Sequence, residues 1–135
     1  MNNDPKPLVD LDHAPTSFTA FKPVGHVVVG FPDDETSQRA QQLLADNGIA
    51  DLQRIAADDM RSHMAEMLDL ASGSAEFGHE IVAMRRFLAM AAKGYGWLVV
   101  AAKDDAAAAR VVELSAPIGA RVAVKYDRLI ITDLL

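Results

Sequence analysis

The chain has 135 residues, of which 50% are hydrophobic, and a formal net charge of −6. This length suits one domain with a buried core and is too short for two ordinary domains. The acidity disfavours nucleic acid as a partner, because a phosphate-binding surface must supply Lys and Arg. The absence of cysteine excludes disulfides, thiolate metal ligands and cysteine nucleophiles, and it is compatible with a reducing compartment, so we expect a cytoplasmic protein.

The first 22 residues contain Pro5, Pro7 and Pro15 among polar residues without periodicity. This composition predicts a mobile N-terminal arm, residues 1–22, followed by a single domain over residues 23–135. The arm lacks the basic and apolar regions of a signal peptide. The longest apolar runs of the chain fall far short of the roughly 20 residues that cross a bilayer. We therefore expect neither export by such a signal nor a membrane location.

The first regular elements are a strand and a helix. The sequence HVVVGF at residues 26–31 is an uninterrupted apolar run rich in valine, which is typical of a strand buried on both faces. Pro32 ends the strand, and either Asp33 or Asp34 can cap the following helix by accepting a backbone N–H. Nucleotide-binding turns need several glycines or a lysine at this place, whereas this turn has one glycine and three acids. We therefore expect no nucleotide there.

The end of this helix carries a strong local signal. Gly48 is placed where a left-handed conformation follows a helix, and Ile49 is positioned to contact Leu44 in a Schellman closure. The segment DLQRIAA at residues 51–57 then predicts a second, weaker strand, because its apolar residues do not alternate strictly.

Two helices follow in the middle of the chain. Asp58 or Asp59 is predicted to cap a helix over residues 60–71, and a second helix is predicted over residues 75–93, ending at Gly94. Together they predict an α-helical hairpin at about residues 58–93. Methionines recur at helical spacing in both halves, which favours packing in a core or an interface. They are Met60, Met64, Met67, Met84 and Met90.

The C-terminal part repeats the pattern of the N-terminal part. YGWLVVAA at residues 95–102 predicts another buried strand, and Asp104 or Asp105 can cap a fourth helix that ends near Ser115. Two more strands are expected over residues 120–126 and 128–134, about a short turn near residue 127.

The predicted order is therefore β-α-β-(α-α)-β-α-β-β. Two βαβ halves of this kind favour an α+β, ferredoxin-like (split βαβ) sheet with an inserted α-helical hairpin. The alternative is a doubly wound α/β fold, in which the same helices would be crossovers between parallel strands.

Two parts of the chain resemble a known family. The sequences HVVVGFPDDETSQRAQQLLADNGI and GWLVVAAKDDAAAARVVELSAPIGA, within residues 24–60 and 95–125, are similar to the general stress protein 17M-like domain of small bacterial proteins. The resemblance implies a bacterial, stress-associated domain and brings no catalytic residues with it. The acidic, methionine-containing hairpin between the two parts departs from the family, which usually has a glycine-rich apolar stretch there.

One group of side chains has the composition of a metal site. His63 and Glu66 are three residues apart, as are Glu76 and His79, so each pair lies on one side of its helix. If the hairpin turns near residues 72–73, the four side chains approach one another and offer ligands for a divalent ion such as zinc or manganese. The other interpretation is a solvated polar face without any ligand. No residue is assigned to catalysis or to cofactor binding.

These features predict a small, non-catalytic, stress-associated binding or assembly module in the cytoplasm. The alternative is a small metal-dependent or small-molecule enzyme with its site at the hairpin. The expected partner is a second copy of the chain, in a homodimer or a higher oligomer. Leu129, Ile130 and Ile131 are consecutive apolar residues of the last strand, and helices on only one face of the sheet would leave this strand without cover.

Overall fold

The computed structural model describes residues 24–71, 78–127 and 131–135. The predicted N-terminal arm, residues 1–22, lies outside the described residues. The strands are β1 (His26–Phe31), β2 (Leu52–Ile55), β3 (Gly96–Ala101), β4 (Val122–Tyr126) and β5 (Ile131–Asp133). The helices are α1 (Asp34–Asp46), α2 (Ala57–Ala71), α3 (Gly78–Ala92) and α4 (Asp105–Ser115), and α4 continues into the 3₁₀ turn η3 (Ala116–Ile118).

The five strands form one sheet in the order β2-β3-β1-β4-β5, and every neighbouring pair is antiparallel. The doubly wound alternative required parallel neighbours and is wrong, because β3 runs back beside β2 instead of crossing over to a parallel position. The fold is α+β and is consistent with the ferredoxin-like class. The α2 and α3 helices are inserted between β2 and β3, and β5 extends the sheet beyond β4.

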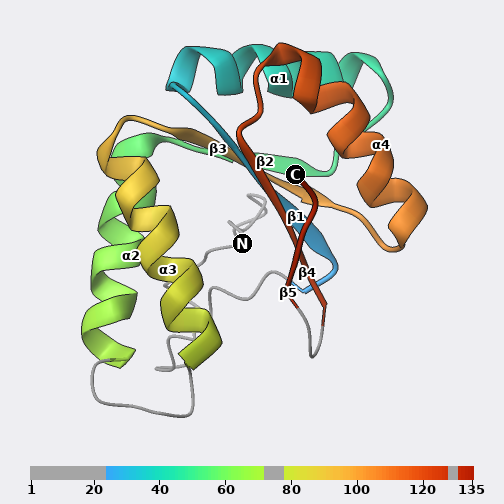
Figure 1. Cartoon of the computed structure of the whole chain (residues 1–135). Coiled ribbons are helices and arrows are strands. Elements are labelled where there is room, and N and C mark those ends of the chain that lie inside the picture. The colour runs from blue at the N-terminus through green and yellow to red at the C-terminus, as the bar shows by residue number, and fades with distance from the viewer. Residues whose placement is uncertain (1–23, 72–77, 128–130) are drawn as a thin grey trace, which may run out of the picture.

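Helices lie on both faces of the sheet, α1 and α4 on one and α2 and α3 on the other (Figure 1). Successive residues of a strand point to opposite faces. Accordingly, Val27 and Val29 pack in the core under α1 and α4, and Val28 packs in the core under the hairpin. The expectation of helices on only one face is therefore wrong, because the inserted hairpin folds back over the sheet.

The boundaries of α1 agree with the prediction. The carboxylate of Asp33 accepts a hydrogen bond from the Thr36 backbone N–H at 2.7 Å. At the other end, Gly48 has a φ of +85° and the Ile49 N–H donates to the Leu44 carbonyl at 2.9 Å, which is the Schellman closure. The cap of α4 is also confirmed, since Asp104 accepts from the Ala107 N–H at 2.8 Å.

The Asp33 cap of α1 makes the free energy of unfolding depend on pH. Hydrogen bonds from the side chain and then the backbone of Thr36 lower the pKa of Asp33 below its ordinary value of 3.8. The cap therefore contributes fully above the unfolded-state pKa, and its contribution is lost as the pH falls through the lowered folded-state pKa. Asp33→Asn keeps a capping oxygen that does not titrate. The free energy of unfolding of this variant should therefore rise relative to that of wild type as the pH falls below about 4. Denaturant unfolding at a series of acidic pH values measures this difference in free energy. A difference that stays constant with pH would contradict the prediction.

The start of α2 differs from the prediction. This helix begins at Ala57, so Asp58 and Asp59 lie in its first turn and do not cap it. The Ala57 backbone N–H instead donates to a carboxylate oxygen of Asp34 in α1, at 3.0 Å. The capping group thus comes from a helix on the other face of the sheet, which a local sequence pattern does not report.

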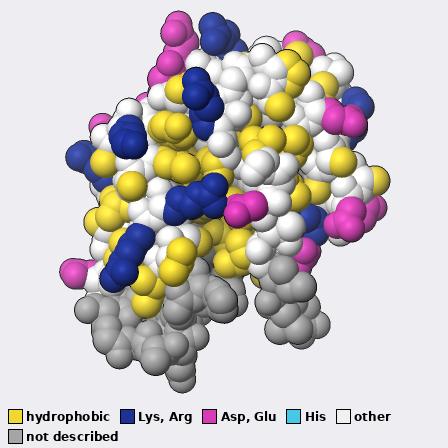
Figure 2. Space-filling view, viewed as in Figure 1, with side chains coloured by type: hydrophobic (Ala, Val, Ile, Leu, Met, Phe, Trp, Pro, Cys, Tyr) yellow, Lys and Arg dark blue, Asp and Glu magenta, His cyan; other side chains and the backbone are white. Residues whose placement is uncertain are grey.

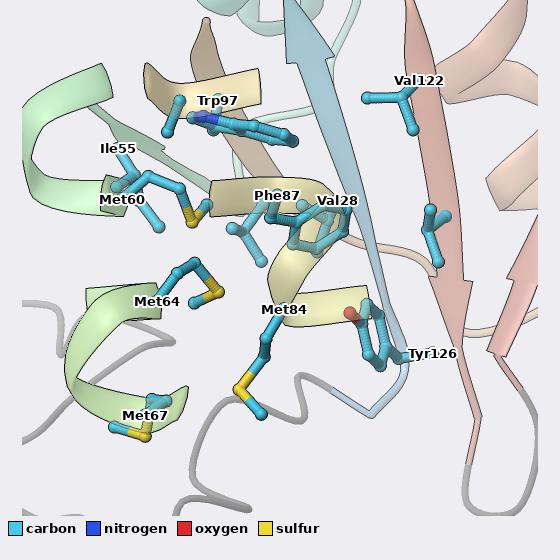
Figure 3. Close-up of a cluster of buried hydrophobic side chains, with 13 residues drawn as sticks. Val28, Ile55, Met60, Met64, Met67, Met84, Phe87, Trp97, Val122 and Tyr126 are labelled. Atoms are coloured by element: carbon cyan, nitrogen blue, oxygen red, sulfur yellow. The ribbon is translucent and has the colours of Figure 1, made fainter. Parts of the chain in front are cut away.

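The predicted methionine stripe forms the core between the hairpin and the sheet (Figure 3). Met60, Met64, Met67 and Met84 are all at most 2% exposed. They pack with the aromatic pair Phe87 and Trp97, whose ring centroids are 4.9 Å apart. The prediction that the methionines pack in a core is confirmed for these four.

Candidate functional site

The β5 strand directs backbone groups outward at the edge of the sheet, where no other described strand pairs with them. The Leu134 N–H donates to the Ala123 carbonyl at 2.7 Å, so Leu134 and Thr132 direct their backbone groups toward β4. The alternation of an antiparallel strand then directs the N–H and C=O groups of Ile131 and Asp133 away from β4. Among the described strands none lies beyond β5. These groups can therefore pair with another strand.

A groove lies beside β5 on the face that carries α4. It has a volume of about 460 Å³. Its lining residues are Ala108, Ala109, Val112, Thr132 and Leu134 together with the acids Asp105 and Glu113. Small side chains on α4 leave this space open above the last strand. The groove therefore combines an apolar floor with negative charge.

A second groove lies beside β5 on the hairpin face, between α3 and the β4 and β5 strands. It has a volume of about 290 Å³ and is lined mainly by Val82, Ala83, Phe87, Val124 and Ile131. An ion pair crosses it, because Arg86 of α3 donates to Asp133 of β5 at 2.8 Å. In the space-filling view, hydrophobic side chains gather in the middle of the molecule with basic and acidic side chains among them (Figure 2). Both faces of β5 thus adjoin partly apolar grooves.

The predicted metal site is only partly within the described residues. On α2, Glu66 is exposed, whereas His63 is partly buried and its Nδ1 has no hydrogen-bond partner among the described residues. Glu76 lies outside the described residues, and of His79 only the backbone, in α3, is described. Among the side chains that are described, no group of three or more His, Cys, Asp or Glu could hold a metal ion. The four-residue site stays a prediction.

A polar junction that the sequence analysis missed joins α1, β2 and β3. Asp34 accepts the α2 N–H described above, and its carboxylate also lies 3.8 Å from the Arg54 guanidinium of β2. The backbone of Gly96 passes directly beside Asp34 and Ser37, leaving no room for a side chain. This junction therefore joins the starts of α1 and α2 to the edge strand β2 and to β3.

Comparisons with protein-family models, with curated proteins and with solved structures found no match to this chain. The resemblance to general stress protein 17M-like domains therefore stays a prediction. The described helices include none that is both long enough and apolar enough to span a membrane.

Proposed function

We propose that the protein is a non-catalytic assembly module that forms a homodimer through the edge of β5. The observation that carries this proposal is the pair of outward-facing residues, Ile131 and Asp133, flanked by a groove on each face of the sheet. An exposed strand edge is a template for pairing with another strand. The charge that would blunt this edge, on Asp133, is already engaged by Arg86.

A symmetric pairing follows from the direction of these backbone groups. Two antiparallel β5 strands related by a two-fold axis at Thr132 place Ile131 of one copy opposite Asp133 of the other. Each of the two residue pairs then exchanges two backbone hydrogen bonds, and the two Thr132 side chains lie opposite each other, a favourable cross-strand pair. The same patch serves both copies, as a two-fold interface requires. The flanking grooves extend the contact beyond the short strand.

Asp133→Pro should convert the dimer into a monomer. Proline removes the outward N–H and places its ring at the edge, yet the hydrogen bonds of Thr132 and Leu134 to β4 remain. The matched control is Asp133→Ala, which also loses the ion pair with Arg86 but keeps the N–H and should stay dimeric. Size-exclusion chromatography with light scattering at micromolar concentration measures both. A monomeric wild type, or a dimeric Asp133→Pro variant, would overturn the proposal.

Two charge substitutions at Thr132, the residue through which the proposed two-fold axis passes, test the axis itself. Thr132→Lys and Thr132→Glu each place like charges directly opposite each other, so each variant alone should be monomeric. An equimolar mixture should form a mixed dimer, because the two charges then attract. A mixture that stays monomeric would place the axis elsewhere.

A further inference from the structure

The helical layer on the α4 face stops short of the sheet edge. The α1 and α4 helices pack against each other, and α4 lies over β1. Beyond α4 the sheet continues through β4 and β5, and above β5 there is the groove of about 460 Å³, with none of the described helices over it. In the homodimer proposed above, two such uncovered margins meet at the two-fold axis.

The two uncovered margins form a trough above the paired β5 strands, between the two α4 helices. The width of this trough can be estimated from the spacing of the strands. Five strand-to-strand steps separate β1 of one copy from β1 of the other. At about 4.8 Å per step, the two α4 helices lie about 24 Å apart. A helix measures about 10–12 Å across with side chains. Between the facing surfaces of the two α4 helices this leaves about 12–14 Å, which is room for one helix.

The walls and floor of the trough determine the chemistry of this helix. Ala109, Val112 and Leu134 present apolar surface, and Ala108 is buried beneath them. The charged residues among the described lining are both acidic, Asp105 and Glu113. Two copies carry a net charge of −12, twice the −6 of one chain, which also attracts a cation over distance.

We infer that the dimer binds one basic amphipathic helix of a partner protein in this trough, an inference that rests on the proposed homodimer. The apolar face of the partner packs on the alanines and leucines of the trough, and its lysines or arginines lie along the acids of the two α4 helices. This is recognition of a helix in a groove, completed only when both copies are present.

The test uses two designed peptides of about 14 residues with leucines at helical spacing, one with lysines and one with glutamates at all other positions. Fluorescence anisotropy should show that the lysine peptide binds with one peptide per dimer, and that the glutamate peptide does not bind. Ala109→Trp fills the trough and should weaken binding by about tenfold or more. The matched control, Ala106→Trp, changes an exposed alanine of the same helix outside the groove and should bind like wild type.

Light scattering on the same samples separates the two proposals. A wild-type dimer that fails to bind the lysine peptide would contradict helix binding in the trough and would leave the homodimer proposal unaffected. Binding of equal strength by monomeric Asp133→Pro, or one peptide per chain, would also overturn the trough, since a single groove would suffice. A wild-type monomer would overturn the homodimer and the trough together.

Discussion

Phe87→Ala is expected to lower the free energy of unfolding by about 4 kcal/mol. Phe87 lies on α3, has no exposed surface, and stacks at a tilt on Trp97 of β3. Truncation removes buried apolar surface and leaves a cavity between the hairpin and the sheet, which the surrounding structure fills only in part. The loss is large because this ring is the main aromatic contact of α3 with the sheet.

Urea unfolding followed by fluorescence measures this effect directly, because Trp97 is the one tryptophan of the chain. The matched control is Val82→Ala on the same helix, where the side chain is 67% exposed. It should change the free energy of unfolding by no more than about 0.5 kcal/mol. Equal losses for the two variants would show that Phe87 does not hold the hairpin on the sheet.

Gly96→Ala is expected to lower the free energy of unfolding by about 3 kcal/mol. A Cβ atom at this position would lie 2.6 Å from the Ser37 hydroxyl oxygen, 2.7 Å from a carboxylate oxygen of Asp34 and 2.8 Å from the Asp34 Cα. The first two atoms belong to side chains and can rotate. The Cα belongs to the backbone of α1, so the helix itself must move away from β3.

The double variant Gly96→Ala, Ser37→Ala distinguishes the two kinds of clash. If the backbone contact dominates, removing the Ser37 hydroxyl restores little stability. The urea midpoint of the double variant then stays well below the midpoint of Ser37→Ala alone. A double variant as stable as Ser37→Ala would assign the cost to the hydroxyl group and contradict the expected movement of α1.

The sequence predicted the elements whose signals are local. Valine runs marked β1 and β3, aspartates marked the caps of α1 and α4, and the spacing of Met60, Met64 and Met67 marked a buried face. Each of these signals is complete within a few residues. Their order along the chain favoured the α+β class over the doubly wound alternative, and the antiparallel pairing of the strands decided between the two.

Interactions between distant residues were not predictable in this way. Asp34 accepts a hydrogen bond from Ala57, 23 residues further on, and Arg86 pairs with Asp133, 47 residues further on. For the ion pair the sequence shows only a charged residue at each end, and for the Asp34 bond it shows only an acid in one helix and the backbone of an alanine at the start of another. Such a residue has many equivalent partners until the sheet order is known.

The candidate site was predictable only in part. The apolar C-terminal run indicated a strand in need of a partner, and this expectation led to the β5 edge. The grooves beside that edge were not predicted, because the alanines of α4 are good helix formers and say nothing about the space opposite them. The groove beside α4 arises from small side chains, which leave no periodic signal.

The insertion point of the helical hairpin has a consequence for how this fold can diversify. The chain leaves β2 at Ile55 and re-enters β3 beside it, where Ile55 pairs with Trp97. An insertion between two adjoining strand ends can lengthen, shorten or exchange its tip without shifting the register of the sheet. Its inner face must still cover Val28 and Val99. Related chains can therefore carry different hairpin tips on one unchanged sheet, provided that the part of α3 that contacts β5 through Arg86 is kept.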